Sequence, residues 1–380
     1  MKRSVKSILF IGNTAWSMYN FRREIFVHFL QQGCDVYVAA PEDMNFSMKI
    51  QALGCNFLPV KIAAKGVNPF EDFLLMFRLI LLFLRIKPDL VFTYTIKPNI
   101  YGACAAFIAR VPLIAVTTGL GYSFLRSNFI AWISRILYKF AFLFPKEVWF
   151  LNCDDRNSFL SEKLVASHKA KLLNSEGINL DNFKPVTTSE KNSTGVSFIL
   201  VARLLWDKGV GEFVEAAKIL KKKYPETRFA LLGFLGIDNP SAIPETALND
   251  WVQNGWVEYL GVTDNVMECI VNFDCVCLPS YYREGVPRSL MEGAAMEKIL
   301  IATDSVGCRN TIDDQITGFL CKVKDPVDLA CCMEKVITMS PQEREKMGKA
   351  GRKKMEQEFD INHVIMQYDS ALRNLYCDRN

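Results

Sequence analysis

The chain has 380 residues, half of them hydrophobic, and a formal net charge of +4. This length exceeds what one hydrophobic core usually supports, so we expect two domains of ordinary size. Residues 1–186 carry 22 Lys or Arg against 13 acidic residues, whereas the remainder carries 23 against 28. The basic half favours an anionic partner, but the absence of a zinc finger, an RNP-type motif or a dense Lys/Arg run disfavours nucleic acid. A negatively charged membrane surface and a lipid diphosphate fit this half better.

Nothing in the sequence has the pattern of a cleaved signal peptide, because the early apolar run at residues 8–11 is too short. The longest apolar segment, residues 73–84, contains Arg78 and falls short of the roughly 20 residues that a spanning helix needs. The twelve cysteines include no Cys-x-x-Cys pair, so we expect reduced thiols. We therefore predict a cytoplasmic protein without a transmembrane helix.

Apolar strand patterns alternate with helical patterns along the whole chain. The first half has strands at 8–11, 36–40, 89–93, 113–116 and 148–151, with a helical pattern at 21–31. A polar stretch at 185–195 separates this series from a second one, with strands at 198–201, 230–233, 257–260, 275–278 and 300–302. Residues 341–376 have the pattern of terminal helices. The alternation predicts an α/β fold with two Rossmann-like domains, residues 1–186 and 187–360, and a further helix at 361–380.

The segment from 279 to 293, Pro-Ser-Tyr-Tyr-Arg-Glu-Gly-Val-Pro-Arg-Ser-Leu-Met-Glu-Gly, is the most informative one. The strand at 275–278 ends there, and Pro287 is well placed to begin a helix because its missing N–H would be unpaired at that position. A helix N-terminus attracts a diphosphate, and an acid one or two turns further along can accept hydrogen bonds from ribose hydroxyls. Glu284 would then contact the sugar and Glu292, on the helix, would contact the ribose. The pattern predicts a nucleotide-sugar site.

Two glutamates eight positions apart, after Pro-Ser and around Glu-Gly-Val-Pro, resemble the motif of the retaining glycosyltransferases of family 4. That family places an Arg and a Lys on the donor diphosphate, and Arg203 and Lys208 match them within residues 201–209. The resemblance continues through residues 258–261, 304–307 and 314–320. It implies the GT-B fold, in which two parallel sheets face across a cleft and the last helix crosses back to the N-terminal domain.

The resemblance also implies roles for individual residues. Glu284, Arg203 and Lys208 are the expected catalytic residues. The expected donor-binding residues are Glu292, Gly12, Asn13, Gly285, Val286, Pro287, Ser280 and Gly261.

Two N-terminal motifs, at residues 93–102 and 118–121, are similar to those of a narrower group within the family. Its members extend polyprenyl-diphosphate-linked saccharides, among them undecaprenyl-linked acceptors of N-acetylgalactosamine and precursors of O-antigen and capsule. The residues expected on the acceptor side are Lys97, Asn99, Thr118, Gly119 and Gly121. The match implies an enzyme that works at the cytoplasmic face of the inner membrane.

The expected reaction is transfer of a hexose or N-acetylhexosamine from a UDP-sugar with retention at the anomeric carbon. Family 4 chemistry is described as front-face displacement, in which the leaving phosphate helps to deprotonate the acceptor hydroxyl, so it requires no protein nucleophile. We expect no cofactor and no metal, because the three histidines are dispersed and the sequence contains no Asp-x-Asp.

Other interpretations remain open. Glu284, Glu292 and Lys97 could each be an ordinary solvated side chain, and the segment from Gly119 to Gly121 could be a plain turn. That segment lacks the third glycine of a dinucleotide fingerprint, having Phe124 there. The apolar face of residues 128–144 suits either a membrane-interface helix or a buried core helix, and residues 70–87 are a weaker membrane candidate. A UDP-sugar epimerase of GT-B fold and a noncatalytic membrane-attached scaffold are the alternative functions.

Overall fold

In the computed structural model the described residues are 7–63, 68–119, 129–186, 195–236 and 238–377. The chain divides into two compact units, Met1–Gly177 with Ile361–Asn380 as unit 1 and Ile178–Asp360 as unit 2. This boundary precedes the predicted one at 186/187, because residues 178–186 pack within unit 2. The backbone N–H of Ile178 donates to Phe359 (2.8 Å), and Arg352 Nη1 donates to the carbonyl oxygen of Phe183 (2.7 Å). The predicted linker at 187–194 lies outside the described residues.

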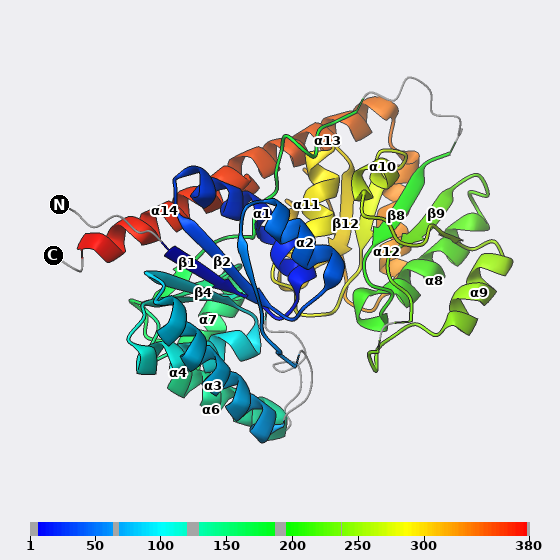
Figure 1. The fold of residues 1–380 in the computed structure, drawn as a ribbon. Helices are drawn as coiled ribbons and strands as arrows, with labels where there is room; N and C mark the ends of the chain where they lie inside the picture. The colour runs from blue at the N-terminus through cyan, green and yellow to red at the C-terminus, as the bar shows by residue number, and fades with distance from the viewer. Residues whose placement is uncertain (1–6, 64–67, 120–128, 187–194, 237, 378–380) are drawn as a thin grey trace. The chain divides into compact units, whose positions relative to one another are not determined.

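Unit 1 is a parallel sheet with helices on both faces (Figure 1). Its elements are β1 (Ser7–Ile11), α1 (Ala15–Gln31), β2 (Asp35–Ala40), α2 (Met44–Ala52), β3 (Asn56–Pro59), α3 (Pro69–Ile86), β4 (Leu90–Tyr94), α4 (Ile96–Ala109), β5 (Leu113–Thr117), α6 (Phe129–Ala141), β6 (Glu147–Phe150), α7 (Cys153–Ser161), β7 (Ala170–Leu172) and α14 (Ile361–Cys377). The strand order is β3-β2-β1-β4-β5-β6-β7, with every neighbouring pair parallel.

Alternating strand residues of unit 1 build two apolar cores. On one face, Leu9, Val91 and Val148 pack with buried residues of α3, α4, α6 and α7. On the other face, Phe10 and Phe92 stack at 5.3 Å and contact α1 and α14, where the Tyr368 ring lies 4.7 Å from Phe92. The period-two alternation of buried side chains is what a sheet covered on both faces requires.

Unit 2 repeats the plan with a parallel sheet ordered β10-β9-β8-β11-β12-β13. Its elements are β8 (Ser197–Val201), η1 (Trp206–Lys208), α8 (Val210–Lys221), β9 (Arg228–Leu232), α9 (Glu245–Gln253), β10 (Glu258–Tyr259), α10 (Val266–Ile270), β11 (Cys275–Leu278), α11 (Arg288–Ala295), β12 (Ile299–Thr303), η2 (Arg309–Thr311), β13 (Gly318–Cys321), α12 (Pro326–Thr338), α13 (Pro341–Lys354) and the π-helical turn η3 (Met355–Phe359). One face of this sheet packs on α8, α9 and α12, and the other on α10 and α11. None of the helices among the described residues has both the length and the apolar character needed to span a membrane.

Candidate active site

In unit 2 the strand order of the sheet changes direction at β8, because the later strand β11 pairs with the free edge of β8 and not with β10. Strands β8, β9 and β10 extend the sheet one way, and β11, β12 and β13 extend it the other way from β8. The carboxyl ends of two such neighbouring strands border a crevice, which is the usual ligand site of an open parallel sheet. Lys208 follows β8 and Glu284 follows β11, so both lie beyond the carboxyl ends of these two neighbouring strands.

Lys208 and Glu284 meet as an ion pair at this point. The Nζ atom of Lys208 donates to Oε1 of Glu284, and the two side chains are only 12% and 11% exposed. Lys208 Nζ also lies 5.0 Å from the centre of the Tyr282 ring, and the hydroxyl of Ser280 donates to the same Glu284 oxygen (2.9 Å). One carboxylate therefore holds the ammonium group at the end of the sheet.

The two loops carrying this pair are joined through the backbone. The carbonyl oxygen of Asp207 accepts from the N–H groups of Tyr281 (3.0 Å) and Tyr282 (3.1 Å), and it lies 3.1 Å from the hydroxyl oxygen of Ser280. Gly209 permits this approach, because a Cβ atom there would lie 2.1 Å from the carbonyl oxygen of Pro279. Its φ of +75° is also a conformation that glycine adopts without steric cost. These contacts on both sides of Lys208 fix the backbone position from which its side chain extends.

The loop after β12 supports Ser280 and Glu284 from the other side. The hydroxyls of Thr303 and Ser305 both donate to the carbonyl oxygen of Ser280, the latter at 3.0 Å. Gly307, with φ +82°, packs so closely that a Cβ atom would lie 2.7 Å from the carbonyl oxygen of Glu284. The loop from Ser280 to Glu284 is therefore supported by side chains of β12 and the turn behind it.

Glu292 lies on α11, one turn beyond Arg288, and is buried. Arg288 Nε donates to Glu292 Oε1 at 2.8 Å. Burial raises the pKa of Glu292, and the neighbouring Arg288 guanidinium only partly opposes that increase. Since Arg288 bonds to one oxygen, this carboxylate keeps acceptor capacity on the other oxygen for a ligand hydroxyl.

The other predicted donor residues of unit 2 lie in the segments that follow its strands. Gly285, Val286 and Pro287 connect Glu284 to α11, and Pro287 stands immediately before the helix. Gly261 follows β10, where its carbonyl oxygen accepts from the N–H of Gly233 (2.9 Å). Arg203 follows β8 with an exposed side chain, and in the described part of the chain no ion pair engages its guanidinium.

Unit 1 has a corresponding reversal between β1 and β4. Gly12 and Asn13 follow β1, and Thr95 to Asn99 follow β4, so the sequence motifs meet at the carboxyl ends of these neighbouring strands. The N–H of Gly12 donates to the carbonyl oxygen of Ala39 (3.1 Å), which ties it to β2.

Lys97 is held by a carboxylate that the sequence analysis did not identify. Its Nζ lies 2.8 Å from Oδ1 of Asp72 on α3, and the Tyr101 hydroxyl donates to Oδ2 of the same residue (2.9 Å). Asp72 is buried and Lys97 is 15% exposed. Burial and the Asp72 carboxylate together raise the pKa of Tyr101. The pairing was not recognisable from sequence because 25 residues separate the two partners and only the packing of α3 on α4 joins them.

Several polar groups near the N-terminus of α4 are buried without partners among the described residues. They are the hydroxyls of Thr93, Thr95 and Thr117 and the Oδ1 atom of Asn99. Asn99 Nδ2 donates to the carbonyl oxygen of Val116 (3.0 Å), which joins α4 to the end of β5. Thr95 has φ +69°, a strained value for a β-branched residue.

The second acceptor-side motif is described only in part. Thr118 and Gly119 directly follow β5, both half-buried, and Gly119 has φ +117°. Gly121 lies outside the described residues.

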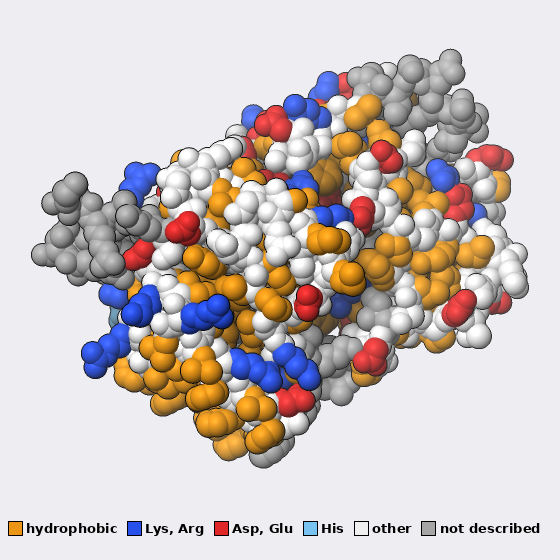
Figure 2. All heavy atoms as spheres, viewed as in Figure 1, with side chains coloured by type: hydrophobic (Ala, Val, Ile, Leu, Met, Phe, Trp, Pro, Cys, Tyr) orange, Lys and Arg blue, Asp and Glu red, His pale blue; other side chains and the backbone are white. Residues whose placement is uncertain are grey.

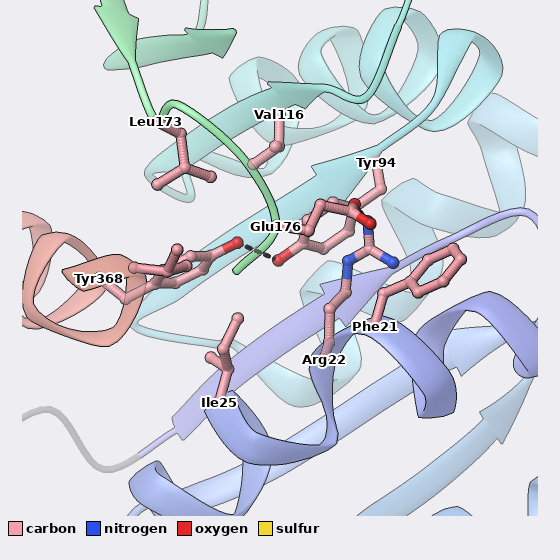
Figure 3. A pocket seen from close by; sticks show the side chains of 9 residues that line it. Phe21, Arg22, Ile25, Tyr94, Val116, Leu173, Glu176 and Tyr368 are labelled. Carbon is pink, nitrogen blue, oxygen red and sulfur yellow. Dashed lines mark hydrogen bonds and ion pairs between the residues drawn. The ribbon is translucent and has the colours of Figure 1, made fainter. Parts of the chain in front are cut away.

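A small pocket of unit 1 contains a buried ion pair that the sequence analysis also missed (Figure 3). Arg22 on α1 pairs with Glu176, its guanidinium carbon lies 3.8 Å from the centre of the Tyr94 ring, and the hydroxyls of Tyr94 and Tyr368 are 2.6 Å apart. Burial raises the pKa of Tyr94 to about 12. These groups bond one another, so the pocket is a junction that fastens α14 to β4 and α1.

No group of three His, Cys, Asp or Glu side chains in the described structure is arranged to hold a metal ion. The site in unit 2 has three cations, Arg203, Lys208 and Arg288, and two carboxylates, together with several hydroxyls, beyond the carboxyl ends of a parallel sheet. Such a set is suited to a ligand that carries both a diphosphate and sugar hydroxyls.

The two halves of the chain match two protein-family models. The model described as "Glycosyl transferases group 1" matches residues 186–354, and the model described as "Glycosyl transferase 4-like" matches residues 7–151.

One curated relative matches nearly the whole chain. It is the N,N'-diacetylbacillosaminyl-diphospho-undecaprenol alpha-1,3-N-acetylgalactosaminyltransferase of Campylobacter jejuni, 28% identical over 387 residues and covering 96% of this chain and 99% of the relative.

Solved structures are similar over the same extent. A glycosyltransferase from Rickettsia africae has a TM-score of 0.80 at 17% identity and covers 98% of this chain and 99% of its own. Anabaena HepE in complex with UDP-glucose has a TM-score of 0.79 at 18% identity and covers 97% and 99%. The two sheets and these neighbours show the GT-B fold predicted from the sequence.

Proposed function

Because the chain belongs to the group 1 glycosyl transferases and is a hexosyltransferase, we propose that it extends a polyprenyl-diphosphate-linked saccharide with a hexose or N-acetylhexosamine from a UDP-sugar. The observation that carries this proposal is the Lys208–Glu284 pair at the sheet reversal of unit 2. The Campylobacter relative, whose name specifies an undecaprenol-linked acceptor, supports the acceptor class. The UDP-glucose complex of a protein of the same fold agrees with a uridine donor.

The donor diphosphate binds between Lys208 and Arg203 in this proposal. The ammonium of Lys208 is held in place by Glu284, whereas the exposed Arg203 side chain is able to turn toward a phosphate that arrives. A planar guanidinium and a point-charge ammonium suit the several oxygens of a diphosphate. Both cations then stabilise the nucleoside diphosphate as its charge develops in the transition state.

The two glutamates act on different parts of the donor. Glu284 accepts hydrogen bonds from hydroxyls of the transferred sugar while it holds Lys208. Glu292 lies further along the chain on α11 and accepts from the ribose through the oxygen that Arg288 leaves available. Gly285, Val286 and Pro287 carry the backbone between these two contacts, and Ser280 positions Glu284.

The acceptor side of the proposal consists of Lys97, Asn99, Thr118, Gly119 and Gly121, whereas Gly12 and Asn13 of unit 1 contribute to the donor side. Lys97 is the cation that contacts the acceptor diphosphate, and Asp72 determines its position. Retention at the anomeric carbon follows from front-face displacement, in which the leaving phosphate takes the acceptor proton. We propose that the enzyme works at the cytoplasmic face of a membrane, because the proposed acceptor is attached to a membrane lipid.

Purified protein incubated with separate UDP-, GDP- and TDP-sugars, with and without a lipid extract containing polyprenyl-diphosphate saccharides, tests the proposal. We expect release of UDP from one donor, and only when the lipid is present. The anomeric configuration of the product, determined by NMR, tests retention.

Two outcomes would contradict the proposal. Conversion of one UDP-sugar into another without acceptor would establish an epimerase. Unchanged product formation by a Glu284→Gln variant, with Glu215→Gln on the exposed surface of α8 as the matched control, would remove Glu284 from the chemistry.

A further inference from the structure

Helix α3 presents apolar side chains on two opposite faces. Leu75, Leu79 and Phe83 are buried against the sheet. The outer face carries Phe70, Phe73, Phe77, Leu81 and Leu84, each between 51% and 70% exposed. An ordinary surface helix has a polar outer face, so packing within unit 1 does not account for these five side chains.

Helix α6 and the end of α4 continue the same surface. The exposed side chains there are Phe107, Ile108, Trp132, Ile136, Phe140 and Leu143, with exposed fractions from 47% to 64%. The rings of Phe107 and Phe144 stack at 4.4 Å, and Phe140 meets Phe144 at 5.2 Å, which joins the two helices. Since α4 packs against both α3 and α6, the exposed residues belong to one side of unit 1. We call these eleven residues the apolar face.

The apolar face is bordered by basic side chains. Residues 68–87, 107–112 and 131–146 contain seven Lys or Arg and two acidic residues, Glu71 and Asp72. Asp72 is buried and paired with Lys97, so the exposed acidic side chains at this surface are Glu71 and Glu162, and Glu162 pairs with Arg135 at 2.6 Å. Figure 2 shows hydrophobic side chains gathered over the end of unit 1 where Figure 1 places α3 and α6, with Lys and Arg side chains alongside.

We propose that the apolar face lies in the interface of a membrane containing anionic lipids. Amphipathic helices insert aromatic and aliphatic side chains at the boundary between headgroups and acyl chains, and Lys and Arg at their margin contact anionic headgroups. The basic border decides between a bilayer and a second copy of the chain, because self-pairing would bring two sets of like charges together. The inference deepens the proposed function, since Asp72 of α3 holds the acceptor-side Lys97 from the same helix that carries the outer apolar side chains.

Flotation with vesicles of phosphatidylcholine alone, or with 30 mole per cent phosphatidylglycerol, measures this binding directly. We expect the protein to bind the anionic vesicles, and a Phe77→Ser, Trp132→Ser double variant to bind at least about tenfold more weakly. The matched control is Met366→Ser with Ile219→Ser, which removes exposed apolar side chains from α14 and α8 and leaves binding unchanged. Circular dichroism establishes that all the proteins are folded.

An Arg85→Gln, Lys139→Gln variant tests the basic border separately, because it leaves the apolar side chains in place. It is expected to lose the preference for anionic over neutral vesicles. Equal binding by wild type and both double variants would overturn the proposal. A dimer in sedimentation equilibrium that Phe77→Ser, Trp132→Ser dissociates, without vesicle binding by the wild type, would assign the apolar face to self-association instead.

Turnover with a water-soluble, short-prenyl acceptor separates this inference from the proposed function. The Phe77→Ser, Trp132→Ser variant retains that turnover while losing vesicle binding if both proposals hold. If wild-type protein binds anionic vesicles but releases no nucleoside diphosphate from any donor, the apolar face is a membrane surface and the proposed transfer to this acceptor is contradicted. If wild-type protein turns over the soluble acceptor but does not bind anionic vesicles, the proposed function is supported and the membrane role of the apolar face is contradicted.

Discussion

Lys208 carries one positive charge at a place where a leaving diphosphate would develop negative charge. Glu284 holds it there through an ion pair, and Gly209 follows the turn that carries Lys208. We expect Lys208→Met to lower kcat/KM by about 10²- to 10³-fold, the usual effect of removing one group that stabilises a transition-state charge. Steady-state release of UDP measures this. Lys218→Met, on the exposed side of α8, is the matched control, and a Lys208→Met enzyme within twofold of it would contradict the role of Lys208.

Gly307 determines how closely the loop after β12 approaches Glu284. An alanine at Gly307 would have a left-handed φ of +82° and a Cβ atom 2.7 Å from the carbonyl oxygen of Glu284. An alanine at Gly255 would have a similar φ of +71°, but its Cβ atom would have no neighbouring atom within 4 Å. We expect Gly255→Ala to lower the free energy of unfolding by about 1–2 kcal/mol from the backbone conformation alone. Gly307→Ala should lose about 1–3 kcal/mol more from the added overlap. Urea unfolding of both variants measures the difference. Equal losses in the free energy of unfolding would show that the loop after β12 moves to accommodate the added Cβ atom without cost.

Glu292 is a carboxyl group whose burial raises its pKa above the ordinary value of 4.5. The folded protein therefore retains a proton on Glu292 at pH values where the unfolded chain has lost it. Its contribution to stability is complete below the unfolded pKa and is lost as the pH rises through the raised folded value. We expect the free energy of unfolding of wild type, relative to Glu292→Gln, to decline as the pH increases from about 4 to 7. A relative stability that grows with pH would mean that the ion pair with Arg288 dominates instead.

At the scale of elements, the sequence predicts the central strands and one edge strand, β10, but misses the other three edge strands. The strands at 8–11, 36–40, 198–201 and 275–278 are continuous apolar runs and occur as β1, β2, β8 and β11. Strands β3 and β7 were not predicted, since they have four and three residues at sheet edges where burial is incomplete. The outer strand β13, four residues long, was also missed.

The residues of the candidate site also fall into those that the sequence predicts and those that it does not. Motifs local in sequence identified Lys208 and Glu284, whose ion pair follows from the adjacency of β8 and β11. Contacts made by helix packing, such as Asp72 with Lys97 or Arg22 with Glu176, have no local pattern. The apolar face of residues 128–144 fits either a core helix or a membrane-interface helix, and in the structure α6 has one buried side, with Tyr138, and one exposed side, with Trp132.

Tyr368 joins helix α14 to the sheet of unit 1. The Tyr368 ring is 4.7 Å from Phe92 and 4.9 Å from Trp149, and its hydroxyl bonds Tyr94. We expect Tyr368→Ala to lower the free energy of unfolding of unit 1 by about 3–5 kcal/mol, as for other large buried aromatics. Tyr368→Phe should cost about 1–2 kcal/mol, because the Tyr94 hydroxyl loses its partner.

Denaturant unfolding with hydrogen exchange of the β1 and β4 amides locates the loss in unit 1. Met366→Ala on the exposed side of α14 is the control and should change the free energy of unfolding by less than about 0.5 kcal/mol. A similar effect of Tyr368→Ala and Met366→Ala would mean that the helix contributes little to unit 1.

At the scale of the whole molecule, charge is distributed between the units according to what each is proposed to bind. The basic first half includes the apolar face and Lys97, which we propose contact a membrane surface and a lipid diphosphate. The second half has a net negative charge, so attraction of a donor diphosphate depends on the local cations Arg203 and Lys208 and not on the overall field of that unit. Donor binding should therefore be sensitive to single substitutions at these two positions.

The same two cations lead to the expectation that turnover does not require a divalent metal. A nucleotide-sugar diphosphate needs its negative charge neutralised as the sugar leaves, and two side-chain cations can provide this as a metal ion does in other enzymes. We expect protein treated with EDTA and freed of it by gel filtration to retain its rate of UDP release in metal-free buffer. Addition of Mg²⁺ or Mn²⁺ should change that rate less than twofold, whereas Arg203→Met should lower it by about tenfold or more. A rate abolished by EDTA and restored by either ion would show instead that Arg203 and Lys208 are insufficient to neutralise the leaving group.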